Sequence, residues 1–190
     1  MARSPAVRVS AALDMFELLE TYEPGSRARV WARVPEPTRE LIDSLWRTQW
    51  IPLEHDHHLP EAIVAEFGIE KSRELFRRAV PSIVEKPMLE PLVFGMLRVL
   101  GTRRTRLLTI IPKGWGLVFR DLCEPRLGTC RDDEIEVIFD SIAPEVREYP
   151  TYLDMWEGIC LGLLDLACPG GALDFERAPD GSRIVARFSW

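Results

Sequence analysis

The sequence predicts an α+β fold, in which N-terminal helices pack with a small antiparallel sheet and a long C-terminal helix is followed by a β-hairpin. Three observations predict it. Segments of helical periodicity, separated by proline and glycine, fill the first hundred residues. Apolar residues then recur at steps of three and four over residues 153–167, and the chain closes on two segments of alternating polarity. Because no linker or internal repeat divides the chain, residues 1–190 are expected to form a single domain.

Prolines divide the N-terminal third into short helices. The first is expected to begin at Val9 and to stop at the first proline-glycine pair. We expect Ser26 to cap a second helix that ends at Arg33, and Thr38 to cap a third that ends at Trp46. Hydroxyl side chains favour these positions because they accept hydrogen bonds from the free amides of a first helical turn.

The middle of the chain is predicted to continue as helices. Residues 50–53 are expected to be extended, since the residue before a proline avoids the helical region. A helix from about Pro60 should end at Gly68, and another should cover residues 70–80 before the next proline. Residues 88–100 form the most apolar helical pattern, which predicts a central helix buried on several sides.

Residues 117–119 and 135–139 are predicted strands because they are short and rich in branched and aromatic side chains. Residues 144–150 are expected to connect the second strand to the long helix.

The final segment predicts a hairpin with its turn at Pro179-Asp-Gly181. The alternation of polar and apolar residues favours a register with Phe175 opposite Ile184, which brings Glu176 near Arg183. A shift by one residue would bury the charged side chains.

Composition excludes some partners. The net charge of -6 and the pI near 5.2 oppose general binding to nucleic acid or to an anionic membrane, since both attract clustered positive charge. The first residues lack the apolar core of a signal peptide, and no apolar run reaches the length of a membrane span. We therefore expect a cytoplasmic protein. The four cysteines show no metal or disulfide spacing and are expected to be small buried hydrophobes.

All three histidines lie together in His55-Asp56-His57-His58. Imidazoles beside a carboxylate suggest a zinc or nickel site. Neighbouring loop residues point in different directions, however, and no further spacing completes a metal shell, so we interpret the cluster first as a solvated loop and expect no metal. The sequence also lacks a nucleophile elbow and a phosphate-binding glycine loop, so no catalytic residue is predicted.

A basic stretch is one candidate binding site, formed by Arg103, Arg104, Arg106, Lys113 and Trp115. The first interpretation is that its cations follow a helix C-terminus, where the helix dipole favours them. The functional interpretation is a clamp for a carboxylate, a phosphate or an acidic partner.

Gly158 and Gly162 are a second candidate, because they lie four residues apart on one side of a helix. Close packing against another element is the first interpretation. The alternative is a groove for the flat or aliphatic part of a ligand, walled by Trp156 and Trp115.

The Trp156-Glu-Gly158-Ile-Cys-Leu-Gly162 helix and the closing hairpin over residues 173–190 resemble a ligand-binding superfamily. It joins 4-vinyl-reductase-like domains, haem–nitric-oxide-binding-like domains and the Bet3-type subunits of vesicle-tethering complexes. Over most of its length, the chain is also similar to a large uncharacterised paralogous family of myxobacterial proteins. Four segments carry that similarity: Trp50-Ile-Pro-Leu-Glu54, Glu61-Ala-Ile-Val-Ala-Glu-Phe-Gly68, Pro87-Met-Leu-Glu-Pro-Leu92 and Ile111-Pro-Lys-Gly-Trp-Gly-Leu117.

The resemblance implies a fold more than an activity. The haem-binding relatives use a tyrosine-serine-arginine signature and a proximal histidine on a helix. This chain shows no such signature, and its only histidines lie in the 55–58 cluster. The 4-vinyl-reductase-like relatives often carry clustered cysteines, whereas Cys160 and Cys168 stand eight positions apart. No haem or metal is carried over to named residues, and no cofactor is expected.

We therefore expect a bacterial, non-catalytic binding module with a sensory or regulatory role. Its partner is expected to be a small hydrophobic ligand or a regulatory protein, with no nucleic acid or membrane insertion, and a homodimer is one form it could take. Two alternatives stay open: a metal-dependent enzyme that uses the histidine cluster, and a structural assembly subunit.

Overall fold

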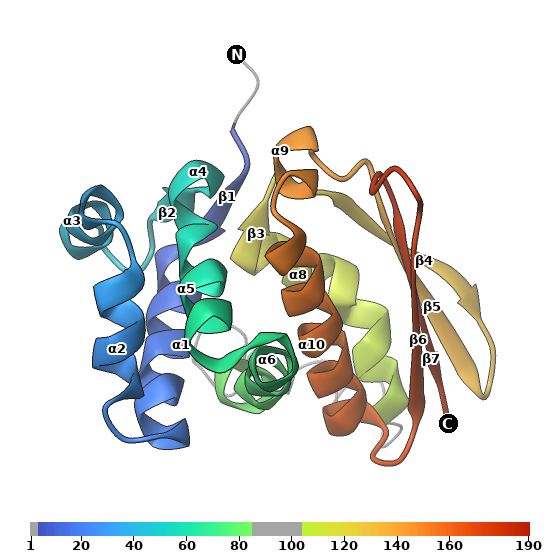
Figure 1. The fold of residues 1–190 in the computed structure, drawn as a ribbon. Helices are drawn as coiled ribbons and strands as arrows, with labels where there is room; N and C mark the ends of the chain where they lie inside the picture. The colour runs from blue at the N-terminus through green and yellow to red at the C-terminus, as the bar shows by residue number, and fades with distance from the viewer. Residues whose placement is uncertain (1–3, 85–103) are drawn as a thin grey trace.

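The computed structural model describes residues 4–84 and 104–190 (Figure 1). The first range contains β1 (Ala6–Arg8), α1 (Val9–Tyr22), α2 (Ser26–Arg33), α3 (Glu36–Ser44), β2 (Trp50–Pro52), α4 (Leu53–Asp56), α5 (His58–Phe67) and α6 (Ile69–Val84). The second contains the 3-10 helix η1 (Arg104–Ile110), α8 (Ile111–Val118), β3 (Phe119–Arg120), β4 (Glu124–Cys130), β5 (Glu134–Asp140), α9 (Pro144–Arg147), α10 (Pro150–Ala167), β6 (Ala172–Arg177) and β7 (Ile184–Ser189). The α+β class is confirmed. The predicted helix over residues 88–100 lies outside the described residues.

The N-terminal helices form where proline spacing predicts them, but two predicted caps are wrong. Gly25, with φ 77°, precedes α2, and Ser26 is the first helical residue. The buried Ser26 hydroxyl donates to the Leu19 carbonyl at 2.6 Å and so ties α2 back to α1. Thr38 lies inside α3, which begins two residues earlier, and its hydroxyl contacts two histidines. Both hydroxyls therefore make tertiary contacts in place of local caps.

Gly68 ends α5 as predicted, with φ 77° and its N–H donating to the Val64 carbonyl at 2.8 Å. The predicted end of the next helix is wrong, because α6 continues through Pro81 to Val84. A proline inside a helix removes one hydrogen bond and crowds the preceding turn. The buried face of α6, which includes Leu75 and Phe76, offsets that cost through its contacts with the rest of the core.

The described residues also form two antiparallel sheets. The smaller has the order β2-β1-β3 and joins the N-terminal helices to the end of α8. The larger has the order β4-β5-β7-β6. The predicted strand over residues 135–139 is confirmed as β5, whereas the prediction for 117–119 is wrong for Leu117 and Val118, which end α8. The short apolar run there suited a strand as well as a helix, and periodicity over three residues does not separate them.

The predicted hairpin forms, but its register is wrong by two residues. Phe175 lies opposite Ala186, and Ile184 lies opposite Arg177. The loop is longer than the predicted turn, since it begins with a hydrogen bond from the Ala178 N–H to the Arg183 carbonyl at 2.9 Å. A shift by two keeps every side chain on its predicted face, so alternation alone did not distinguish the two registers.

Helix α10 lies between α6 and the larger sheet (Figure 1). On its sheet side lies an aromatic cluster, in which the centroid of the Trp115 ring is 4.8 Å from that of Phe139 and 5.0 Å from that of Trp156. Val137 and Phe139 of β5 and Phe188 of β7 are fully buried beneath α10. Within the described ranges, no helix combines the length and hydropathy that a membrane crossing needs.

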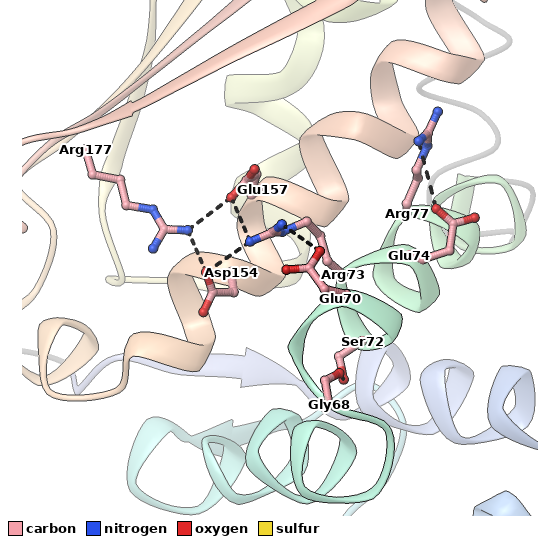
Figure 2. A network of polar contacts seen from close by, with 9 residues as sticks. All are labelled: Gly68, Glu70, Ser72, Arg73, Glu74, Arg77, Asp154, Glu157 and Arg177. Atoms are coloured by element: carbon pink, nitrogen blue, oxygen red, sulfur yellow. Dashed lines mark hydrogen bonds and ion pairs between the residues drawn. The ribbon is translucent and has the colours of Figure 1, made fainter.

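An ion-pair network ties α6, α10 and β6 together (Figure 2). Asp154 and Glu157, one turn apart on α10, accept hydrogen bonds from Arg177 of β6 at 2.8 and 3.2 Å. Arg73 of α6 approaches the same two carboxylates at 3.6 and 3.5 Å. Because these groups are partly exposed, the network orients the three elements more than it stabilises them.

Candidate functional site

A cavity of about 160 Å³ lies between the N-terminal helices and the C-terminal half of the chain. Side chains of α1, α4, α5, α6, η1, α8 and α10 line it, together with residues of β1 and β3. Among the described residues, every lining side chain is apolar except Asp56. The cavity is therefore an apolar pocket, and Asp56 is the single ionisable group among its described lining residues.

Helix α10 supplies one wall through Met155, Ile159, Leu163 and Leu166. These residues recur at steps of three and four, so they form a single stripe along the helix. Ile159, Leu163 and Leu166 remain partly exposed although they lie deep in the fold. Trp115 of α8 and Phe76 of α6 face the same space from other sides.

Asp56 ends α4 and is 4% exposed. The hydroxyl of Tyr152, which is fully buried on α10, donates a hydrogen bond to Oδ2 of Asp56. Burial raises the pKa of Asp56 to about 7, against a smaller opposing effect of the Tyr152 hydrogen bond. Burial also raises the pKa of Tyr152. Near neutral pH, the carboxyl is therefore present in both its neutral and its ionised form.

Two of the three histidines contact the Thr38 hydroxyl and not Asp56. The Thr38 hydroxyl lies 2.9 Å from Nδ1 of His55 and 2.9 Å from Nδ1 of His58. Since a hydroxyl has one proton, it donates to one imidazole and accepts from the other. His57 stacks on Tyr149 with ring centroids 3.8 Å apart.

This arrangement does not form a metal site. Burial first, and then the neighbouring His57, lower the pKa of His58. In the described part of the chain, no group of three or more histidine, cysteine or acidic side chains is placed to hold a metal ion. Of the two carboxylates that the metal hypothesis could use, Asp56 or Glu54, the first bonds to Tyr152 instead.

The predicted basic clamp is placed only in part. Arg103 lies outside the described residues, and Arg104 begins η1. Arg106 and Lys113 are exposed and do not line the cavity. Trp115 is buried and does line it. The clamp for an anion therefore stays a prediction, while its tryptophan belongs to the apolar pocket.

Gly158 and Gly162 pack against α6, as their first interpretation predicts. A Cβ at Gly158 would lie 2.6 Å from the Arg73 carbonyl oxygen, and one at Gly162 would lie 2.3 Å from the Arg77 carbonyl oxygen. The alternative of a ligand groove along these glycines is wrong, because the α6 backbone fills that space. Trp156 is also not part of the cavity lining and lies behind Trp115.

Sequence reasoning missed the role of Asp56. The sequence shows this residue only as one member of a histidine-rich segment, whereas the cavity that Asp56 lines brings together six other helical segments. The available signal was weak: Asp56 lies between histidines three residues after the buried Leu53, which is the spacing of one helix face.

The sequence itself matches no family model, and no curated protein matches it. Solved structures do match the fold. An Fe(II) unliganded H-NOX protein variant from K. algicida covers 96% of this chain and 95% of its own, with a TM-score of 0.66 and 8% identity. An H-NOX variant from T. tengcongensis covers 94% of both chains, with a TM-score of 0.56 and 15% identity. An oxygen-binding H-NOX domain related to soluble guanylate cyclases covers 93% of this chain and 90% of its own, with a TM-score of 0.57 and 16% identity.

The chain has the H-NOX fold. This is the fold that the resemblance to haem–nitric-oxide-binding-like domains implies, and the comparison shows the fold alone.

Proposed function

We propose that this chain is a non-catalytic sensory module that binds a small apolar ligand in the cavity between its two halves. The observation that carries the proposal is the cavity itself, which is lined by apolar side chains of helices from both halves and is about 160 Å³ in volume. An engineered apolar cavity of about 150 Å³ in another protein binds benzene or xenon. A ligand of that size would touch both halves at once and could shift their packing.

The described residues do not fit a haem. Ligand sites for drug-sized molecules begin at roughly 300 Å³, which already exceeds this cavity, and a haem is larger than most drugs. No arginine or lysine in the described lining is available to pair with its propionates. All three histidines of the chain lie in the 55–58 cluster, outside the lining, so none is placed as an axial ligand. The proposed ligand is therefore not the haem of the H-NOX structures.

The state of the thiols supports a non-catalytic role. Burial raises the pKa of Cys123 to about 12 and also raises that of Cys160. The thiolate is the reactive form of cysteine, so these two residues are poor nucleophiles at neutral pH. The membership in a myxobacterial family, the cytoplasmic location, the homodimer and a regulatory protein partner remain predictions.

Toluene tests the proposal, because it matches the cavity in size and has no polar group. We expect toluene to raise the melting temperature of the full chain, since a ligand that binds only the native state stabilises it. Ala11 lines the cavity on α1, and Ala11→Leu should abolish that rise by filling the space. Ala28→Leu, on the exposed surface of α2, is the matched control and should keep it. A wild-type chain that binds neither toluene nor phenol, a probe of similar size, in calorimetry or ligand-detected NMR would overturn the proposal.

A further inference from the structure

We propose that the ligand of this cavity is a neutral apolar molecule with one hydroxyl group, which it places on the carboxyl of Asp56. This inference rests on the proposed function and names the chemistry of its ligand. One buried acidic side chain, Asp56, lines a pocket whose other described side chains are apolar.

The Asp56 carboxyl has spare hydrogen-bonding capacity. Tyr152 donates to Oδ2, and in the described part of the chain no other side chain or backbone group bonds to Asp56. An ionised carboxylate accepts about four hydrogen bonds, and a protonated carboxyl donates one and accepts others. Asp56 lines the cavity, and within the described residues only Tyr152 bonds to its carboxyl, so a ligand with a hydrogen-bonding group would supply a second bond there.

A hydroxyl satisfies this site better than a charged group. A ligand carboxylate would meet the like charge of Asp56. An ammonium group has three N–H donors, and the apolar lining gives two of them no acceptor. A hydroxyl both donates and accepts, so it pairs with the ionised and with the neutral form of Asp56.

The volume limits the rest of the ligand. About 160 Å³ accommodates a ring or a branched chain of roughly the size of benzene, with little room for a second substituent. Phenol and toluene are therefore suitable probes: they are alike in size, and they differ in whether the ring carries a hydroxyl or a methyl group. Toluene is the more hydrophobic of the two, so a preference for phenol must come from a polar contact.

The experiment compares the affinities of phenol and toluene for the full chain by titration calorimetry. We expect phenol to bind about tenfold more tightly than toluene to the wild type, as one added hydrogen bond at a buried site predicts. Asp56→Leu combined with Tyr152→Phe removes both hydrogen-bonding partners, so neither is left unsatisfied, and should reverse the preference while toluene still binds. Glu54→Gln, which changes an exposed carboxylate on the same helix, should leave the preference unchanged.

Each result has one meaning. Equal or tighter binding of toluene to the wild type overturns the hydroxyl ligand and leaves the proposed function in place. A preference for phenol that survives in the double variant overturns the role of Asp56. Failure of both probes to bind the wild type overturns the proposed function itself.

Discussion

The two long faces of α10 differ in how tightly they are packed. On one face, Gly158 and Gly162 let the α6 backbone approach so closely that no methyl group would fit between the helices. On the other, Met155, Ile159 and Leu163 border a cavity. Both faces are apolar in sequence, so hydrophobicity does not set the difference. Side-chain volume and the position of the opposing elements do.

This contrast suggests how a ligand in the cavity could act on the rest of the fold. We call the face with Gly158 and Gly162 the closed face and the face that borders the cavity the open face. The closed face holds α6 and α10 together, and the Arg73–Asp154 and Arg177–Glu157 contacts connect this pair of helices to β6 (Figure 2). A ligand on the open face would therefore move the N-terminal helices relative to a rigid block, rather than deform α10.

The largest expected effect is a pH dependence of stability, which tests whether the Asp56 carboxyl on the open face is shielded from water. Because the pKa of Asp56 is raised to about 7 in the folded chain from an ordinary value of 3.8, the native state binds more protons between these values. The free energy of unfolding should therefore fall as pH rises from 4 to 8, by up to about 4 kcal/mol. Urea unfolding at several pH values measures this.

Asp56→Asn is the control, since it should remove this part of the pH dependence. The lowered pKa of His58 acts in the opposite direction, because its contribution is lost as pH falls. The difference between the wild-type and Asp56→Asn profiles isolates the carboxyl. If the free energy of unfolding depended on pH with the same slope in both proteins, Asp56 would be in contact with water. This would contradict the proposed difference between the two faces of α10.

Neighbouring leucines on α10 compare the two sides directly. Leu164 is 3% exposed in the packed core, and Leu163 faces the cavity. Leu164→Ala should lower the free energy of unfolding by about 3 kcal/mol, because it opens a new cavity. Leu163→Ala should cost about 1 kcal/mol, because that side chain already has fewer contacts. Equal losses in chemical unfolding would show that the cavity wall is as well packed as the core.

Adding one methyl group tests the closed face. Gly162→Ala places a Cβ against the Arg77 carbonyl oxygen and Val80, so it should lower the free energy of unfolding by about 2 kcal/mol despite the better helix propensity of alanine. Gly116→Ala in α8 is the matched control, since its Cβ meets nothing within 4 Å, and it should be neutral or stabilising. A neutral Gly162→Ala would mean that α6 moves away easily.

The smallest expected effect concerns the polar edge of the closed face. Arg177→Gln should lower the free energy of unfolding by about 0.5 kcal/mol, because Asp154 and Glu157 keep their contacts with Arg73 and all four groups are partly exposed. The loss should decrease further in 1 M salt, which screens such pairs. A loss above 2 kcal/mol would indicate that the network, and not the glycine contact, holds α6 to α10.

Much of the fold could be predicted from the periodicity of apolar residues and from the positions of proline and glycine. Proline and glycine marked the ends of α1 and α5 and both ends of α2, and steps of three and four identified α10. Patterns of this kind are local, so the sequence contains them in full. β1 and β4 were missed, because β1 has three residues and β4 contains a proline and a glycine and is mostly exposed.

The sequence alone determined the α+β class, the inward face of each strand of the hairpin and the small-residue face of α10, since these follow from the order of residue types along short segments. Tertiary structure decided the hairpin register, the contacts of Ser26 and Thr38, and the cavity with Asp56 in its wall. A cavity is the space that several distant segments leave between them. Its existence depends on how those segments pack, and no local pattern records that.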